Sequence, residues 1–225
     1  MNRVRRVTAE AVGTGLLLAA IVGSGIMGER LAGGNVAIAL LANSIATGAA
    51  LVALILAFGP ISGAHFNPLV TLCVAGRGGL SRREAVEYVA AQLFGAALGV
   101  IVAHGMFGEP LLSFSTHSRS GLSQAFSEYV ATFGLIGTIW ACARNRPESI
   151  SISVGAYIVA AYWFTASTSF ANPAVTLARA MTGTFAGIRL VDVPAFIAAQ
   201  LLGALSAALL FGWLVAPVSP AKERP

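Results

Sequence analysis

Two short segments, NPLVT at Asn67–Thr71 and NPAVT at Asn172–Thr176, repeat almost the same residues far apart in the chain. Proline suits the first turn of a helix, because its missing N–H would have no helical partner there. Each segment is therefore predicted to begin a helix, which the preceding asparagine can cap. The same asparagines can also donate hydrogen bonds to a passing hydroxylated solute. One such motif is a weak indication of a functional site, whereas two copies are a strong one. The candidate residues are Asn67, Pro68, Leu69, Asn172, Pro173 and Ala174.

Two glutamates, Glu10 and Glu128, interrupt apolar runs. A charge at the centre of a bilayer costs at least ~3 kcal/mol, so a carboxylate at that depth is expected to have a function or a partner. Coupling the movement of a solute to protons is one such function.

The composition indicates a membrane protein. Of the 225 residues, 56% are hydrophobic and 10% are charged, and the mean hydropathy is +0.79. Soluble domains carry about 25% charged residues, so the lipid bilayer is the expected surrounding. The net charge of +5 comes from scattered basic residues. No patch combines basic and aromatic residues, so no nucleic acid partner is expected.

The reactive side chains do not suggest catalysis. Cys73 and Cys142 lie in apolar surroundings and are expected to be core residues, with no disulfide framework, metal cluster or cofactor site. The alternative for Cys73 is a thiol near a pore that binds mercurials or trivalent arsenic. No nucleophile–base pair is evident, so the chain is not expected to be an enzyme.

Six apolar runs reach the roughly 20 residues that a membrane-spanning helix needs. They are Thr8–Met27, Val36–Phe58, Ala85–Phe107, Leu122–Ala143, Ile150–Thr168 and Val193–Val215. Two shorter runs, Asn67–Ala75 and Asn172–Met181, are predicted to be half-helices that enter the membrane from a loop. The first run follows basic residues, as in a signal peptide, but its glutamate and the later runs favour a membrane helix.

The two halves of the chain repeat one another. The segment EAVGTGLLL at Glu10 resembles EYVATFGLI at Glu128, and AAQLFGA at Ala90–Ala96 resembles AAQLLGA at Ala198–Ala204. Each half has three spans, so the second copy must be inverted in the membrane. We expect an all-α membrane protein with six transmembrane helices and two re-entrant half-helices. Residues 1–225 form one channel domain, with repeats over about 8–107 and 122–215.

Electrostatics predicts both the orientation and the behaviour of a pore. Ten Lys and Arg residues fall on the side of the termini and four on the other side, which predicts that both termini are cytoplasmic. The four are Arg30, Arg119, Arg179 and Arg189. The N-termini of the half-helices can meet near the midplane. Each carries roughly half a positive charge, so together they oppose cations and protons.

The segments SGAHFNP at Ser62–Pro68 and NPAVT at Asn172–Thr176 resemble the aquaporin and aquaglyceroporin family of membrane channels. The resemblance implies a six-helix bundle with one pore per subunit, assembled as a homotetramer. It also implies that Glu10 and Glu128, helped by glutamines at positions 92 and 200, accept hydrogen bonds from the loops before the half-helices. His65 is expected to line the cytoplasmic vestibule, and a response to pH is the alternative.

The sequence departs from the family at two positions. Leu69 replaces the usual alanine of the first motif, which is read as a packing change. Val175 replaces the arginine that usually forms the outer constriction, and Arg179, one turn later, is expected to point away from it. Spacing matches the other filter positions to Thr47, to Ala160 or a neighbour, and to Ser169. These residues are small or medium-sized and uncharged, so the filter is predicted to be wide and moderately apolar.

Such a filter resembles a bacterial subgroup of the family that is associated with arsenic-resistance operons. The favoured function is a passive channel in the bacterial inner membrane for small neutral solutes, namely arsenite and other metalloid hydroxides, methylated arsenicals and glycerol, with some water. Size and polarity alone fit glycerol or urea equally well. The alternatives are a water-selective aquaporin and an ion-coupled secondary transporter, and against the transporter no carboxylate occurs among the predicted lining residues.

Overall fold

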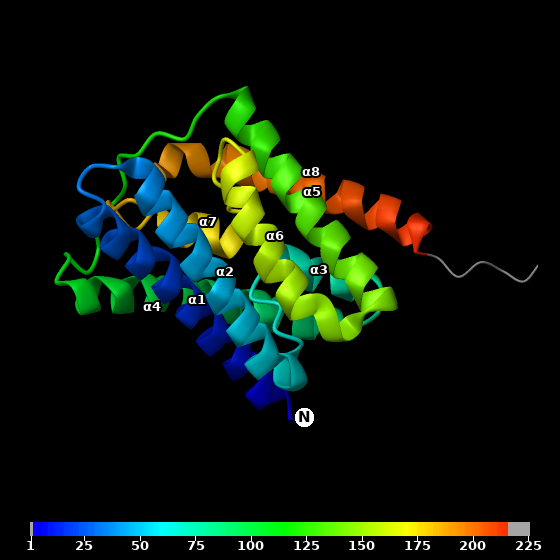
Figure 1. Cartoon of the computed structure of the whole chain (residues 1–225). Coiled ribbons are helices and arrows are strands. Elements are labelled where there is room, and N and C mark those ends of the chain that lie inside the picture. Colours follow the sequence, from blue (N-terminus) through cyan, green and yellow to red (C-terminus); the bar gives the residue numbers. More distant parts are fainter. Residues whose placement is uncertain (1, 216–225) are drawn as a thin grey trace, which may run out of the picture.

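The computed structural model describes residues 2–215, which form a bundle of long helices around two short ones (Figure 1). The elements are α1 (Arg3–Leu31), α2 (Val36–Ser62), α3 (Pro68–Gly76), α4 (Arg82–Phe107), α5 (Leu122–Asn145), η1 (Pro147–Ser149), α6 (Ile150–Phe164), α7 (Pro173–Arg179), η2 (Leu190–Asp192) and α8 (Val193–Leu214). The all-α architecture predicted from the sequence is confirmed. Two of the ten basic residues that the sequence predicts on the side of the termini, Lys222 and Arg224, lie outside the described residues.

Within the described residues, five helical segments are long and apolar enough to cross a membrane: α1, α2, α4, α5 and α8 extended by η2. The sixth predicted span is shorter than expected. Helix α6 has 15 residues and is about 22 Å long. It ends at Phe164 rather than Thr168, because the chain turns at Thr165 into the loop that leads to α7. Helix α7 likewise ends at Arg179, two residues before the predicted end.

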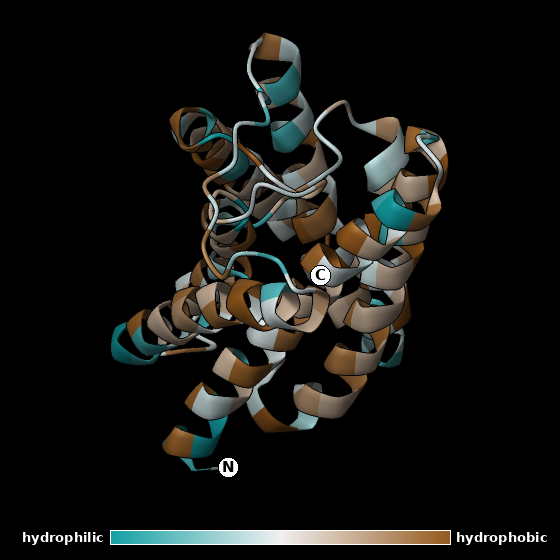
Figure 2. Ribbon diagram, turned by 90° about the vertical axis from the view of Figure 1, so that its left-hand side faces the viewer, coloured by the Kyte–Doolittle hydropathy of each residue, from teal (hydrophilic) through white to brown (hydrophobic). Residues whose placement is uncertain are grey.

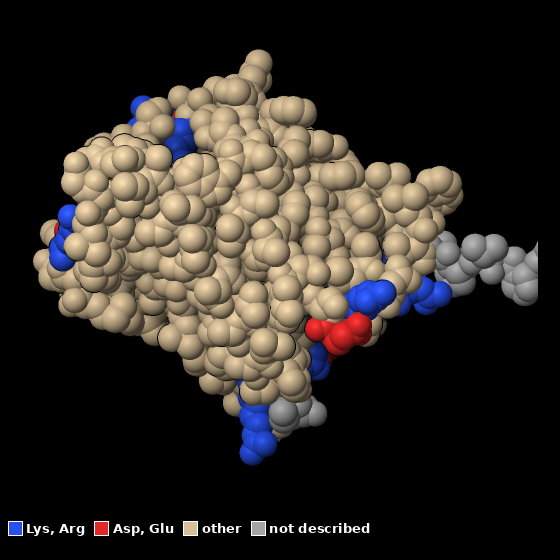
Figure 3. Space-filling model, viewed as in Figure 1, with Lys and Arg blue, Asp and Glu red and all other residues tan. Residues whose placement is uncertain are grey.

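The outside of the bundle is suited to lipid. Large apolar side chains of the long helices are exposed, among them Phe94, Leu98 and Val102 on α4 and Leu202, Leu205 and Leu209 on α8. Hydrophilic residues gather near helix ends and loops (Figure 2), and on the face in Figure 3 charged side chains lie at the margins of a broad uncharged surface. A bilayer would cover this uncharged belt.

The packing of the helices follows the sequence repeat. Helix α1 packs on α2 and α4, and in the second half α5 packs on α6 and α8. Gly95 and Gly203 hold equivalent positions on α4 and α8. A β-carbon at Gly95 would collide with the Ala11 carbonyl on α1, and one at Gly203 with the Tyr129 carbonyl on α5. These glycines let the helices of each pair, α1 with α4 and α5 with α8, approach closely. The long helices packed in this way form the frame that surrounds the half-helices.

Candidate functional site

The half-helices α3 and α7 begin at the two asparagine motifs, and each motif binds the other. The side-chain amide of Asn67 donates a hydrogen bond to the carbonyl of Ala171 (2.8 Å), and that of Asn172 donates to the carbonyl of Phe66 (2.8 Å). Each asparagine Oδ1 also accepts from the backbone N–H two residues later, as a helix cap does. Each asparagine therefore caps its own half-helix and also links the two motifs.

The loops before the half-helices have the same unusual backbone. Non-glycine residues adopt positive φ at equivalent places: Ala64 and Ser169 at 49° and 50°, and Phe66 and Ala171 at 48° and 47°. Each such residue costs on the order of 1–3 kcal/mol, so the surroundings must hold it. The repeat in sequence is thus a repeat in backbone conformation as well.

Glu10 holds the first loop. Its carboxylate accepts four hydrogen bonds, from the Ser62 hydroxyl (2.6 Å), the backbone N–H groups of His65 (2.9 Å) and Phe66 (2.8 Å), and the Gln92 amide (2.8 Å). The carboxylate is fully buried. Four bonds to one ionised carboxylate use its acceptor sites completely, so the group fixes the loop backbone at membrane depth.

Glu128 holds the second loop in the same way. It accepts from the backbone N–H groups of Phe170 (2.8 Å) and Ala171 (2.9 Å) and from the Gln200 amide (2.6 Å). Gln200 also donates to the Thr176 hydroxyl at 2.9 Å, as Gln92 does to the hydroxyl of the first motif's threonine. Sequence reasoning missed these threonines, although their place four residues after each motif asparagine is a readable signal.

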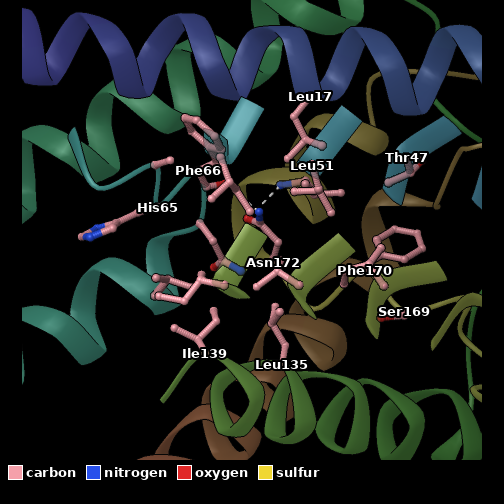
Figure 4. A pocket seen from close by; sticks show the side chains of 18 of the residues that line it. Leu17, Thr47, Leu51, His65, Phe66, Leu135, Ile139, Ser169, Phe170 and Asn172 are labelled. Atoms are coloured by element: carbon pink, nitrogen blue, oxygen red, sulfur yellow. Dashed lines mark hydrogen bonds between the residues drawn. The ribbon is translucent and has the colours of Figure 1, made fainter. Parts of the chain in front are cut away.

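A cavity of ≈ 240 Å³ passes the meeting point of the two motifs. Figure 4 shows Thr47, Ser169 and Phe170 towards one end, His65 at the other, and Asn172 between them. Aliphatic side chains line much of the cavity, among them Leu17, Ile21, Leu51, Ile55, Leu135 and Ile139. Polar groups come from the motifs and their loops. The cavity therefore offers both apolar surface and hydrogen-bonding groups to the same solute.

Three of the four residues predicted to form a filter lie together in the wall of this cavity: Thr47, Ser169 and Val175. The Thr47 hydroxyl lies 3.2 Å from the Tyr162 hydroxyl, and the two share a hydrogen bond. The Ser169 hydroxyl is buried and has no hydrogen-bond partner among the described residues.

The prediction for Ala160 is wrong, and the α6 residue beside Thr47 is Tyr162. Ala160 is exposed on the outer side of the helix and does not line the cavity. The lining residues of α6 are Ile150, Val154, Ile158 and Tyr162, which recur every four residues along one helix face. Ala160 falls between two of them and faces away.

The expectation that Arg179 points away from the constriction is also wrong. Arg179 lines the cavity and is 2% exposed, and its guanidinium carbon lies 3.5 Å from the centre of the Phe170 ring. Its Nε donates to the Ala186 carbonyl. Helical side chains lean towards the helix N-terminus, so Arg179 covers wall beside Val175, one turn earlier.

His65, Leu69 and Cys73 differ in their relation to the cavity. His65 lines it, and its Nδ1 lies 3.0 Å from the Thr71 hydroxyl. Leu69 is buried instead in an apolar cluster with residues of α5 and α8, and Cys73 packs against that cluster. Neither of these two lines the cavity. Packing therefore accounts for Leu69 and Cys73, and of these three residues His65 is the one that lines the cavity.

The loop of residues 108–121 lies over the Ser169 end of the cavity. Arg119 anchors this loop through bonds to the carbonyls of Gly187 (2.8 Å) and Ser167 (3.2 Å). Its guanidinium carbon is 5.1 Å from the Phe170 ring. Burial lowers the pKa of His117 in the same loop, and the charges of Arg119 and Arg179 lower it further. This end of the molecule is thus a positively charged region.

The sequence is similar to known channel proteins over nearly its whole length. It is 56% identical over 216 residues to the aquaglyceroporin AqpS of Rhizobium meliloti (strain 1021), covering 96% of this chain and 92% of that protein. It is 30% identical over 243 residues to the probable aquaporin AqpM of Archaeoglobus fulgidus, covering 95% of this chain and 98% of that protein.

The fold also has a solved counterpart. The X-ray structure of the aquaglyceroporin from Plasmodium falciparum matches with a TM-score of 0.74 at 20% identity, covering 95% of this chain and 99% of that chain. At this identity the likeness shows the fold. The family model described as Major intrinsic protein matches residues 1–165 and 145–223. Together with the identity to the Rhizobium protein, this match shows that the chain belongs to the major intrinsic protein family of membrane channels.

Proposed function

We propose that this protein is a passive aquaglyceroporin-type channel for small uncharged hydroxylated solutes, with arsenite and other metalloid hydroxides, methylated arsenicals and glycerol favoured and some water passed. The whole chain, 1–225, acts as one channel domain with repeats over about 8–107 and 122–215. Its pore motifs are Asn67-Pro68-Leu69 and Asn172-Pro173-Ala174. Its outer filter is formed by Thr47, Tyr162, Ser169 and Val175.

The observation that carries this proposal is the short apolar side chain of Val175 in the cavity wall. Val175 is 3% exposed and contributes a short apolar side chain where a long arginine would narrow the cavity. The hydroxyl pair of Thr47 and Tyr162 lies in the wall of the same cavity. A compact molecule with several hydroxyls and no charge can exchange its water hydrogen bonds for these groups.

An ion-coupled transporter is the function from another class, and the hydrogen bonds of the glutamates argue against it. A proton-carrying carboxylate needs a free acceptor site and access to the solute path. Glu10 accepts four hydrogen bonds and is fully buried behind its loop, and Glu128 accepts three in the same position. Protonation of either would break bonds that hold the strained loop backbone.

The proposal also covers the orientation of the chain in the membrane and its assembly into an oligomer. We place both termini on the cytoplasmic side of a bacterial inner membrane, since the basic residues near Arg3 and Arg83 lie at one end of the bundle, both bound to Glu87. The apolar outer faces of the helices are taken to be shared between lipid and three further copies, in a homotetramer. Native mass spectrometry from detergent would give the copy number directly.

Stopped-flow light scattering on proteoliposomes tests the function. Water, glycerol and arsenite permeabilities are measured in one preparation, against protein-free liposomes. The channel proposal expects fast glycerol and arsenite flux that is linear in concentration and unchanged by a proton gradient. Fast water flux without solute flux would mean a water-selective filter. Saturating flux that follows the proton gradient would mean a transporter.

A further inference from the structure

We propose that Arg179 is the charge filter of the outer channel, held in place by Phe170 and Arg119, in the absence of an arginine at position 175. The proposal rests on the proposed function as a channel for neutral solutes, and it names the group that rejects cations. A neutral solute should pass Arg179, whereas a cation of the same size and shape should be repelled.

The first support is the position of the guanidinium. Arg179 lines the same cavity as Thr47, Ser169 and Val175. Its guanidinium carbon lies 3.5 Å from the centre of the Phe170 ring, and Figure 4 places that ring beside Ser169 at one end of the cavity. The charge is therefore at the level of the filter, although the Arg179 backbone is one helical turn beyond it.

The second support is that most N–H donors of the Arg179 guanidinium have no protein acceptor among the described residues. A guanidinium has five N–H donors, and the residues that the structure describes accept from one of them, Nε, which donates to the Ala186 carbonyl. Among residues 2–215, no carboxylate lies within ion-pair distance of Arg179. A charge at membrane depth without a counter-ion is expected to face water or a solute in a cavity. The terminal N–H groups can then donate to solute oxygens.

The third support is the arrangement that keeps the guanidinium against the wall. Arg119 binds the carbonyls of Gly187 and Ser167 and lies 5.1 Å from the same Phe170 ring. The ring is thus flanked by two cations, and stacking on it stabilises each of them. Because Arg179 lies against the ring, it presents its charge from the cavity wall. Arg119 and Phe170 are positioning residues in this scheme.

The nearest carboxylates do not neutralise this charge. Asp192 is engaged by the Arg119 backbone N–H (2.8 Å) and by the Arg189 side chain (3.0 Å). Glu128 is bound to the loop backbone on the side away from the cavity. The outer end of the cavity is therefore positive, which adds to the positive ends of the two half-helices.

The alternative is a structural role. Arg179 also ties down the outer loop, because its carbonyl accepts a bond from the Ile188 backbone (3.3 Å) as well as its Nε donating to Ala186. A purely structural arginine would affect all solutes alike when replaced. A charge filter would affect cations and leave neutral solutes unchanged, so the test must compare two solutes that differ only in charge.

Urea and guanidinium are such a pair, because both are small and planar and one is a cation. Radiolabelled uptake of each is measured in proteoliposomes with the unsubstituted protein and with Arg179→Met, which keeps a long side chain that can cover the Phe170 ring. The guanidinium-to-urea permeability ratio is expected to rise at least about tenfold, given a repulsion over a few ångströms in a medium of reduced dielectric constant. Urea permeability should stay within about twofold.

Controls separate charge from folding. Arg30→Gln removes another outer arginine, one that is paired with Glu109 at the surface, and should leave the ratio unchanged. Arg179→Lys keeps the charge and should keep the ratio low. Arg179→Gln gives a second uncharged variant if Arg179→Met does not fold.

The outcomes are distinguishable. An unchanged ratio with preserved urea uptake in an uncharged variant would overturn the proposal. An equal loss of both permeabilities in a correctly assembled variant would assign Arg179 a structural role and would also overturn it. Absence of urea, glycerol and arsenite uptake in the unsubstituted protein would instead contradict the proposed channel function.

Discussion

Replacing Val175 by arginine tests the width of the filter most directly. Val175 is 3% exposed and lines the same cavity as Thr47 and Ser169. An arginine there extends several atoms into the space that a valine leaves open. Arsenite and glycerol are larger than water, so their permeabilities are expected to fall far more than water permeability.

The structure adds a cost in stability that the sequence did not reveal. Positions 175 and 179 are one helical turn apart, about 5–6 Å between β-carbons. Two guanidinium charges about 6 Å apart in a medium of effective dielectric constant about 20 repel by about 3 kcal/mol. Stabilities of folded proteins are commonly about 5–15 kcal/mol, so Val175→Arg alone should melt at a clearly lower temperature. Adding Arg179→Leu removes this repulsion, so the double variant should melt at a higher temperature than Val175→Arg alone while the filter stays narrow.

Both effects can be read from one preparation. Thermal stability is followed by fluorescence-detected size-exclusion chromatography, and permeabilities to water, glycerol and arsenite by stopped-flow light scattering. Unchanged arsenite and glycerol flux through a correctly assembled Val175→Arg variant would refute the role of Val175 in the wall. A variant as stable as the unsubstituted protein would refute the proximity of the two guanidinium groups.

Three further predictions concern the frame and the outer loop. Glu128→Gln removes charge-assisted bonds to the second loop and should lower stability by about 3 kcal/mol, without making flux depend on a proton gradient. Gly203→Val should prevent assembly, measured as loss of the size-exclusion peak, because even a β-carbon there would collide with the Tyr129 carbonyl. Burial lowers the pKa of His117 and the Arg119 charge lowers it further, so Arg119→Gln should raise that pKa towards 6.5 in an NMR titration.

Matched controls exist for each of these changes. Glu29→Gln alters an exposed glutamate of α1 and should leave stability unchanged. Gly105→Val places its side chain in open space on α4 and should assemble normally. Arg30→Gln removes an outer arginine that does not lower the pKa of His117. Equal effects in a control and its partner variant would contradict the corresponding prediction.

The sequence predicted the parts of the site that the repeat duplicates. Asn67 and Asn172 could be paired from the amino-acid sequence alone, and the pairing implied that two half-helices meet. Gln92 could be paired with Gln200 because each stands in a near-identical segment, whereas their role beside the glutamates came from the resemblance to the family. A residue type that recurs at equivalent positions of both repeats indicates a shared structural role, because the same residue at the same spacing rarely recurs by chance.

The sequence did not predict the residues whose placement depends on the rotation of a helix. The choice between Ala160 and Tyr162 needs the phase of α6 relative to α2, and no repeat or motif marks that phase. Arg179 was misplaced for a different reason, because its Cα position was read without the lean of its side chain towards the helix N-terminus. Both corrections place a larger or more polar group at the outer filter than spacing alone suggested.

The two ends of the channel differ although their loops share one backbone. Ala64 and His65 occupy the positions that Ser169 and Phe170 occupy in the other loop, with matching φ at Ala64 and Ser169. The buried glutamates bind backbone N–H groups, so they fix this conformation whatever the side chains are. Side chains in these loops can therefore change without loss of the frame. The Ser169 end combines the Thr47–Tyr162 hydroxyl pair with an aromatic ring that holds Arg179, and for that reason discrimination between solutes is expected there rather than at the His65 end.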